Sequence, residues 1–465
     1  MKSFNAIYCF NLHGGSRIGE ISPETETDEN VFDIKQGVTI LLCVKEPNNP
    51  SLAKIYYADL WGLREEKYNA LSETYVETND WCAFQPKSPY YYFTPQEVEA
   101  RAEYEKESKK ITDIFQISSI GILTARDKLT IHWTAEQLHK TVKDFVSLPE
   151  DEARQKYKLQ KDTQDWKVHL AQADLRNHPD VEQHIQPINY RPYDTRWTYY
   201  TGQSRGFHCA PRPLIMPYLQ KENPALCTHR SLRSASTWQH VFVTDRIIDG
   251  NCISNKDGPT HVFPLYLYPN PKELGLATKR SLNFKSPFLT ALSEALELPQ
   301  TAPFNLPEGV SPEGILAYIY AILSSPTYRQ RYYDFLKYDF PRIPLPQDID
   351  HFRTLAALGQ HLIDWHLLKD VQIPAVHRFE GEGDGVVGKA RYLDGRVWIN
   401  PTQYFTDVPE DVWEYEIGAY QVCEKWLKDR KGEVLRHEDV RQYRAILVAI
   451  AETLAVMAEI DSVLW

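Results

Sequence analysis

Three near-continuous apolar runs close to the N-terminus constrain the fold of this chain more than any other feature. They span residues 4–12, 38–44 and 53–58. Strands without polar alternation are typical of the interior of an α/β sheet, where other layers cover both faces. We therefore predict buried strands at these three positions. Because a sheet of this kind needs further strands, we expect the chain to begin partway through a domain.

The sequence pattern changes beyond these runs. Residues 95–115 and 134–175 are rich in charged, helix-favouring residues. Residues 185–270 are rich in β-branched and aromatic residues interrupted by Pro, Gly and Asn, which is typical of short strands. Helical patterns dominate residues 346–465, around a Gly-rich hairpin at 380–400. We predict a mixed α+β fold, in which a partial α/β sheet is followed by a β-rich region and a helical C-terminal region.

Charge is distributed unevenly along the chain. The net charge of -11 argues against general attraction to DNA or to anionic membranes. Between Arg191 and Arg246, however, eight basic residues stand against three acidic ones. In residues 190–213 the basic residues are all arginines, and they are interleaved with aromatic residues. A guanidinium donates hydrogen bonds to phosphate or to the O6/N7 edge of guanine, and aromatic rings stack on bases.

The stretch 190–213 therefore predicts contact with double-stranded DNA. A second interpretation is that 192–196 and 204–206 are ordinary turns, in which Asp194 pairs with Arg191 or Arg196. We name as candidate DNA-contacting residues the arginines and tyrosines of the basic interval, together with one arginine that follows an upstream strand: Arg126, Arg191, Arg196, Arg205, Arg212, Arg230, Arg233, Tyr193 and Tyr200.

Several other classes of site find no support in the sequence. Asp59, Glu65 and Lys67 loosely fit the D…E-x-K pattern of metal-dependent nucleases, but such a match arises easily by chance and we reject it. The histidines show no paired ligand spacing, so we predict no metal site. The seven cysteines form no C-x-x-C pair, which favours a reducing cytoplasm over a disulfide scaffold. No apolar run approaches membrane-spanning length, and we expect no membrane partner.

Taken together, these segments resemble the C-terminal portion of type ISP restriction-modification enzymes, single chains that combine nuclease, helicase, adenine-N6 methyltransferase and target-recognition modules. The resemblance covers nearly the whole chain, and its specificity comes from the order and number of the matching segments. They are residues 7–14, 29–37, 57–62, 121–127, 190–196, 202–209, 263–268, 325–331, 339–344 and 420–430.

The resemblance implies a role for each part of the chain. Residues 1–115 would be the C-terminal remnant of an adenine-N6 DNA methyltransferase fold. Phe32 falls where such enzymes place the aromatic residue that stacks on the extruded adenine; a core position at the entry of a strand is the alternative for this residue. Residues 116–345 would form the target-recognition domain, and 346–465 its mostly helical C-terminal part.

The chain departs from the family in the residues that carry catalysis. It has neither the Asn/Asp-Pro-Pro-Tyr/Phe tetrapeptide nor a glycine-bearing loop for S-adenosylmethionine. We therefore expect no complete catalytic site, no cofactor bound by this chain alone and no methyl transfer by it alone, although the family implies S-adenosylmethionine.

Three hypotheses about function follow. The first is a module that recognises a DNA target sequence. The second is a subunit of a split adenine-N6 methyltransferase, completed by a polypeptide that carries the missing methyltransferase, helicase and nuclease parts. The third is a degenerate remnant without function.

Overall fold

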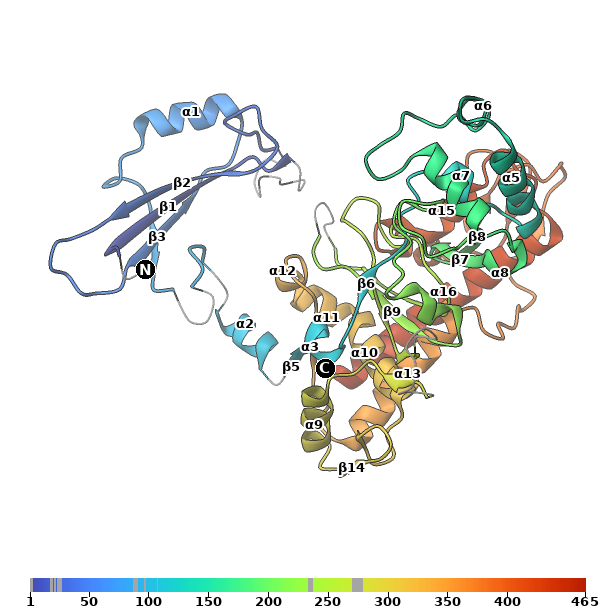
Figure 1. Ribbon diagram of the computed structural model, residues 1–465. Helices are drawn as coiled ribbons and strands as arrows, with labels where there is room; N and C mark the ends of the chain where they lie inside the picture. Colours follow the sequence, from blue (N-terminus) through green and yellow to red (C-terminus); the bar gives the residue numbers. More distant parts are fainter. Residues whose placement is uncertain are drawn as a thin grey trace. The chain divides into compact units, whose positions relative to one another are not determined.

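The computed structural model divides the chain into two compact units (Figure 1). Unit 1 comprises Met1–Lys106 with Leu232–Ser236, and unit 2 comprises Glu107–Ser231 and Thr237–Trp465. The structure describes residues 3–16, 20, 22, 27–86, 91–95, 98–106, 108–232, 237–269 and 279–465.

A four-stranded mixed sheet of order β2-β1-β3-β4 forms the centre of unit 1. β1 (Ala6–His13) pairs antiparallel with β2 (Val38–Val44) and parallel with β3 (Lys54–Asp59). β4 (Cys82–Phe84) pairs antiparallel with β3. Helix α1 (Arg64–Glu73) follows β3 and lies over one face of the sheet (Figure 1). The three strands predicted from the apolar runs are confirmed.

The burial expected for these strands is correct for β1 and β3 alone. Side chains of these strands take part in two small buried clusters: Ile7 and Ile55 with the neighbouring Ala53, and Phe10 and Leu12 with Val31. In β2, by contrast, Ile40, Leu41 and Leu42 are between 44% and 51% exposed. The expectation of a buried strand is wrong for β2, the first strand in the order of this sheet, because the described residues leave the side chains on both of its faces partly uncovered.

Unit 2 combines many short strands with longer helices. Its strands are β5 (Ser108–Lys110), β6 (Ser119–Ile120), β7 (Ile185–Arg191), β8 (Asp194–Tyr199), β9 (Ala225–Thr228), β10 (Val241–Thr244), β11 (His261–Pro264), β12 (Tyr266–Leu267), β13 (Ser281–Leu282), β14 (Gln300–Thr301), β15 (Leu306–Pro307), β16 (Arg342–Pro344), β17 (Phe379–Glu380), β18 (Arg391–Leu393), β19 (Arg396–Trp398), β20 (Tyr404–Phe405), β21 (Glu416–Ile417) and β22 (Tyr420–Gln421). A sheet of order β10-β9-β11-β6 lies in its core, β7 and β8 form a hairpin, and β17-β20-β19-β18 form a second sheet.

The helices are distributed over both units. They are α2 (Val98–Glu105) in unit 1, and α3 (Ile111–Ile114), α4 (Asp127–Thr130), α5 (Ala135–Ser147), α6 (Glu150–Lys156), α7 (Val168–Asn177), α8 (Val181–His184), α9 (Ser286–Ala295), α10 (Pro312–Ser324), α11 (Pro326–Arg331), α12 (Tyr333–Leu336), α13 (Ile349–His366), α14 (Glu410–Glu414), α15 (Val422–Asp429) and α16 (His437–Leu464) in unit 2, with a short 3-10 helix at Met216–Gln220.

Side-chain caps explain where the principal helices begin. The side chains of Thr134, Ser311 and Asp348 accept a backbone hydrogen bond from the first turn of α5, α10 and α13. α10 is buried over almost its whole length, and it packs against α13 and α16. Among the short strands, β10 contacts α10 and α13, and β16 contacts α10.

The predicted α+β class is confirmed. The helical region predicted at 134–175 consists of the three helices α5, α6 and α7. The division at residue 345 stays a prediction; α10 and α13, which lie on either side of that position, pack together within unit 2. Within the described ranges, no helix combines the length and apolar character needed to cross a membrane.

Candidate nucleic-acid interface

The first part of the stretch 190–213 is the β7–β8 hairpin, and its charged residues are bonded within unit 2. Its tight turn places Tyr193 in the left-handed region, with φ 58°. Behind the turn, the buried Asp194 accepts hydrogen bonds from Arg196 (Nη2–Oδ2 2.8 Å) and from Arg430 (Nη2–Oδ1 3.1 Å). The interpretation of this segment as a turn fixed by an Asp194–Arg196 pair is confirmed. Because Arg430 follows α15 directly, the same carboxylate joins the hairpin to the C-terminal helices.

Aromatic rings and a second carboxylate occupy the remaining faces of these arginines. The Arg196 guanidinium lies 3.8 Å from the ring of Trp133 and 4.1 Å from that of Tyr190. The Arg191 guanidinium lies 3.8 Å from the same Tyr190 ring, and it donates to Asp249 Oδ1 at 2.8 Å. The Nε of Arg191 has no hydrogen-bond partner, but it is buried. Guanidiniums that are buried and largely engaged have little left to offer a phosphate or a base.

Four of the nine candidate residues are therefore inside unit 2. Arg191, Tyr193 and Tyr200 are buried, and the side chain of Arg196 is only 12% exposed. Tyr193 packs against Phe242 and His366, which belong to the core. These four side chains expose little or no surface that DNA could reach. We therefore correct the candidate set by removing them.

The second part of the stretch forms a different site. A bridge between Leu123 and Ala210 brings the turn that carries Arg126 beside the loop that carries Arg205 and Arg212. Burial and Asp165 raise the pKa of the Cys209 thiol, while the charges of Arg212, Arg126 and Arg205 oppose this shift. The three guanidiniums and the Asp165 carboxylate therefore share the surroundings of one thiol. We call Arg126, Arg205 and Arg212 the arginine cluster.

The arginine cluster has no carboxylate partner among the residues that the structure describes. Arg126 donates to the carbonyl oxygens of Ala125 (2.7 Å) and Lys161 (3.0 Å), and its guanidinium lies 4.7 Å from the Trp166 ring. Arg205 is exposed. Arg212 is partly buried and burial lowers its pKa; its Nε is buried and has no hydrogen-bond partner, so only the outer part of the guanidinium can be reached from outside. These charges are available to an external anion.

Two residues of the arginine cluster have an unusual backbone conformation. Arg205 and Arg212 have φ values of 59° and 58°, in the left-handed region that non-glycine residues rarely adopt. The backbone N–H of Arg205 donates to the Cys209 carbonyl oxygen at 3.1 Å, which closes the turn between them. Strained backbone of this kind is found preferentially at functional sites, where the surrounding fold maintains it.

The other two candidate arginines lie outside this cluster. The side chain of Arg230 is 68% exposed, and its Nε lies 3.8 Å from Asp339 Oδ1. That separation is typical of a weak surface ion pair. Arg233 lies outside the described residues.

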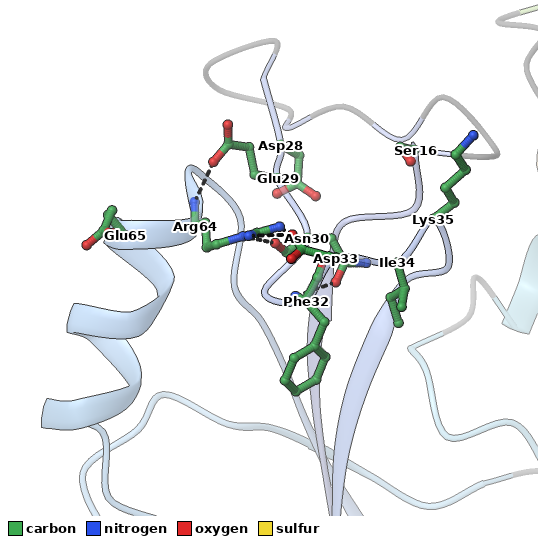
Figure 2. A pocket seen from close by; sticks show the side chains of 10 residues that line it. All are labelled: Ser16, Asp28, Glu29, Asn30, Phe32, Asp33, Ile34, Lys35, Arg64 and Glu65. Carbon is green, nitrogen blue, oxygen red and sulfur yellow. Dashed lines mark hydrogen bonds and ion pairs between the residues drawn. The ribbon is translucent and has the colours of Figure 1, made fainter.

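Unit 1 presents a second candidate site around Phe32. Phe32 is 57% exposed and lines a cavity of about 680 Å³ together with charged side chains, among them Asp33, Lys35 and Arg64 (Figure 2). In Figure 2 the phenyl ring extends away from the carboxylates above it. The exposed ring shows that Phe32 is not a core residue at a strand entry.

Hydrogen bonds from the side chains of Asn30 and Arg64 hold the loop that carries Phe32. Asn30 Nδ2 donates to the carbonyl oxygens of Gly14 (3.0 Å) and Gln36 (2.6 Å), and Asn30 Oδ1 accepts from the Phe32 backbone N–H (2.8 Å). Arg64 donates to the carbonyl oxygens of Asn30 (2.7 Å) and Phe32 (3.1 Å). The loop is rigidly held, while the ring at its tip remains exposed.

A buried ion pair supports the same loop from beneath. Lys67 is fully buried, and its Nζ lies 2.6 Å from Asp28 Oδ1 while donating to the carbonyl oxygens of Leu12 and Glu29 at 2.7 Å. Asp59, which the nuclease pattern would place beside Lys67, instead bonds His13 (2.7 Å). This geometry agrees with the rejection of that pattern. Within the described ranges, no group of three or more His, Cys, Asp or Glu residues is arranged to hold a metal ion.

A comparison with known protein families assigns the larger part of the chain to one of them. The signature of the type ISP C-terminal specificity domain matches residues 113–459. The chain belongs to this family.

Three solved structures share the fold of this type ISP chain. They are the DrdV–DNA complex (20% identity, TM-score 0.67), a nuclease-deletion mutant of the type ISP restriction-modification enzyme LlaGI in complex with a DNA substrate mimic (18%, 0.61), and the ATP-dependent type ISP restriction-modification enzyme LlaBIII bound to DNA (18%, 0.66). The matches cover 98%, 98% and 99% of this chain, which spans 48%, 44% and 31% of those chains. At these identities the likeness shows the fold alone. No curated protein matches the chain in sequence.

Sequence reasoning missed the residues that decide which arginines of the type ISP specificity domain are available. Asp249 and Arg430 engage the hairpin from distant parts of the chain, and no local pattern indicates them. The supports of the Phe32 loop were also missed. Asp28 and Arg64 each lie next to a segment that carries the family resemblance. That position in the sequence was the one indication that they support the loop.

Proposed function

We propose that this chain is the module that recognises a specific DNA sequence for a type ISP-like restriction-modification enzyme. The arginine cluster carries the proposal, because it gathers three cationic side chains without carboxylate partners among the described residues, in a chain of net charge -11. The DNA-bound state of LlaGI and LlaBIII, which share the fold, supports it. In this proposal the acidic remainder of the chain limits non-specific attraction, so that binding depends on the cluster.

The cluster's members differ in the contact that each is built to make. Arg126 is held against Trp166 with two donors already used, so it is suited to a phosphate at fixed distance. Arg205 and Arg212 lie on one loop with strained backbone; Arg205 is exposed and Arg212 is partly buried, and neither has a carboxylate partner among the described residues. A guanidinium with its fork unoccupied is suited to the O6/N7 edge of guanine.

Binding of duplex DNA by alanine variants tests the proposal. The duplex is selected from a random library with the unaltered chain, and affinity is measured by fluorescence anisotropy over a range of salt concentrations. We expect Arg205→Ala and Arg212→Ala each to weaken binding by about 1–3 kcal/mol and to relax preference at one base position. Arg126→Ala should weaken binding to all sequences alike and reduce the salt slope by about 1.

Arg353→Ala is the matched control. Arg353 lies on α13, its side chain is 62% exposed, and its contact with Asp350 is long at 3.8 Å. This variant should bind the selected duplex as the unaltered chain does. Equal affinity in all three cluster variants and the control would exclude the cluster as the DNA contact.

A second candidate function is that of a subunit in a split adenine-N6 methyltransferase. The exposed Phe32 on its rigid loop supports it, because an enzyme that modifies a base must stack the extruded base on such a ring. The glycines after β1 do not fit S-adenosylmethionine: the amides of Gly14 and Gly15 donate to Asp28 Oδ2 and Glu20 Oε2 at 2.6 and 2.8 Å. In this proposal the cofactor site and the catalytic tetrapeptide belong to another polypeptide.

Methyl transfer to the selected duplex tests the second function. The chain is mixed with the polypeptide, encoded nearest to it, that carries the Asn/Asp-Pro-Pro-Tyr/Phe tetrapeptide, and transfer of labelled methyl groups from S-adenosylmethionine is followed. Transfer should require both polypeptides, and Phe32→Ala should lower kcat by at least about tenfold while DNA affinity stays the same. Phe32→Tyr serves as the conservative control. The absence of transfer with both polypeptides present would rule out this function.

A further inference from the structure

The arginine cluster is assembled from two segments that are distant in the sequence. Arg126 directly precedes α4, whereas Arg205 and Arg212 lie on the loop that follows β8. The backbones of Leu123 and Ala210 join the two segments through hydrogen bonds of 3.0 and 2.9 Å. A phosphate contact and a base contact can form together only if their separation matches the duplex. The cluster therefore needs a fixed spacing between its two segments.

A buried threonine of β8 lies between these two segments. The Thr198 hydroxyl donates to the carbonyl oxygen of Thr130, the last residue of α4, at 2.8 Å. On its other side, Thr198 Oγ1 lies 2.7 Å from Nε2 of His208, which stands between Arg205 and Arg212 in the sequence. Thr198 and Thr130 are fully buried, and His208 is 2% exposed. One hydroxyl thus joins both segments of the cluster inside unit 2.

The chemistry of the three groups fixes the direction of both hydrogen bonds. A hydroxyl has one hydrogen, and a carbonyl oxygen can only accept, so Thr198 donates to Thr130 and must accept from the N–H at Nε2 of His208. Burial lowers the pKa of His208 to about 4, so its ring is neutral at neutral pH. A valine at position 198 would have nearly the same shape but would remove both bonds.

The strand that carries Thr198 is held at both of its ends. Near its C-terminal end, Trp197 exchanges backbone hydrogen bonds of 2.8 and 2.9 Å with His132, which lies just beyond α4. At its first residue, the Asp194 carboxylate is bonded to Arg430. Because these contacts hold β8 against the rest of unit 2, Thr198 has a fixed position relative to the segments on either side.

A second contact from the hairpin supports the segment of Arg126. The hydroxyl of Tyr190 on β7 donates to Asp127 Oδ2 at 2.9 Å, and Asp127 follows Arg126 directly. The Tyr190 ring is in turn contacted by the guanidiniums of Arg191 (3.8 Å) and Arg196 (4.1 Å). The two buried arginines of the hairpin therefore hold the tyrosine that fixes the turn beside Arg126.

We infer that the β7–β8 hairpin sets the spacing of the arginine cluster, and that Thr198 is the positioning residue on which its sequence preference depends. The Thr198 hydroxyl fixes the separation between the phosphate contact of Arg126 and the base contacts of Arg205 and Arg212 without touching DNA. This inference rests on the proposed recognition of DNA by the cluster, and it extends that function to residues that DNA does not reach.

Binding by two substitutions of Thr198 in the full chain tests the inference. Affinity is measured for the selected duplex, for duplexes with one changed base pair and for an unrelated duplex. Thr198→Val should bind the selected duplex about tenfold more weakly and lose most of its preference over the changed duplexes. Its affinity for the unrelated duplex should change by less than about twofold, because phosphate contacts carry that binding. Thr198→Ser keeps the hydroxyl and should retain both affinity and preference.

A double-mutant cycle separates positioning from stability. In a chain that carries Arg205→Ala and Arg212→Ala, the base contacts are already absent. Thr198→Val should then weaken binding by less than about twofold, because it acts through those two side chains. A purely structural role would produce the same loss in both backgrounds.

Thr453→Val is the matched control. Thr453 is a fully buried threonine of α16, and its hydroxyl donates to the Ala449 carbonyl oxygen at 2.6 Å. Thermal melting is recorded for both valine variants, and binding is measured well below the lower of the two melting temperatures. Thr453→Val should bind every duplex as the unaltered chain does, since its hydroxyl has no contact with the cluster.

Tyr190→Phe provides a second variant if Thr198→Val does not yield a folded chain. It removes the bond to Asp127 and leaves the ring in place. Because this change loosens the turn beside Arg126, the salt slope of binding should fall toward that of Arg126→Ala, by up to about 1. Sequence preference should change less than in Thr198→Val.

Failure of this inference and failure of the proposed function give different results. Suppose that the arginine variants weaken binding. Unchanged preference in Thr198→Val, equal losses in both backgrounds of the cycle or an unchanged salt slope in Tyr190→Phe would then each overturn the inference and leave the function intact. Unchanged binding in all three arginine variants would reject the function, and the inference with it.

Discussion

The surroundings of each guanidinium decide the role of each arginine in this chain. Arg196 and Arg191 have carboxylates and aromatic faces around them, and they stabilise the hairpin. Arg205 and Arg212 have no carboxylate partner among the described residues, and their loops are held in a strained conformation. Arginines of one short stretch can therefore differ in role: some are structural, and others have no carboxylate partner among the described residues.

Removal of Asp194 should destabilise unit 2. In the Asp194→Ala variant, Arg196 and Arg430 would both remain buried without this partner. We expect a loss of about 3–5 kcal/mol in the free energy of unfolding, measured by urea denaturation. Arg353→Ala, which breaks an exposed pair, should change it by less than about 0.5 kcal/mol. Similar stability of the two variants would contradict the assignment of Asp194 as a buried anchor.

The sequence alone could locate the arginine–aromatic stretch, but it could not show which of its arginines are buried and which belong to the arginine cluster. The turn at 192–196 and its Asp194–Arg196 pair were predictable, because the two residues are neighbours in sequence. The burial of Arg191 was not, since it depends on Asp249, which is 58 positions away. The arginine cluster was not predictable from the sequence either, because Arg126 comes beside Arg205 and Arg212 only through a bridge between two distant segments.

At the scale of elements, a small residue sets the distance between two long helices of unit 2. Gly359 of α13 faces α10, and a side chain at this position would overlap the carbonyl oxygen of Ala317 and approach the methyl group of Ala321. The absence of a side chain lets the two helices approach closely. The helical pattern of the sequence predicts both helices, but it does not predict this contact, because the two surfaces meet only in the folded chain.

Gly359→Ala should force the two helices apart. The added methyl group has no room against the backbone of α10, so we expect a loss of about 1–3 kcal/mol in the free energy of unfolding, despite the better helix propensity of alanine. Thermal unfolding followed by far-UV circular dichroism measures the change. Ala357→Ser, at an exposed position two residues earlier on α13, is the control and should change stability by less than about 0.5 kcal/mol. Equal melting of Gly359→Ala and the unaltered chain would contradict the close approach of α10 and α13.

At the scale of the whole molecule, the buried histidines make folding sensitive to acid. Burial lowers the pKa of His208 to about 4, and that of His229 and of His366 to about 3. In the unfolded chain each ring has its ordinary pKa of about 6.5. Above that pH both states are neutral and the histidines do not affect stability. As the pH falls below about 6.5, the unfolded state alone takes up protons, and stability is lost down to about pH 3–4.

The free energy of unfolding should therefore fall steeply between about pH 7 and pH 5. Each of these histidines contributes a loss of up to about 2 kcal/mol at pH 5. Burial raises the pKa of Asp249 to about 6, and this group opposes the trend because the folded state favours its protonated form. Urea denaturation at about pH 7.5, 6 and 5 measures the change. A constant free energy over this range would contradict the neutral, buried state of the histidines.

The bond between Asp194 and Arg430 has a consequence for protein engineering. It links residues 236 positions apart, across the position near 345 where the sequence pattern changes. An exchange of target specificity between related enzymes that joins two parents near 345 would combine a hairpin from one with an anchoring helix from the other. Chimaeras should instead be joined at the boundary between Lys106 and Glu107, so that the carboxylate and its guanidinium come from the same parent.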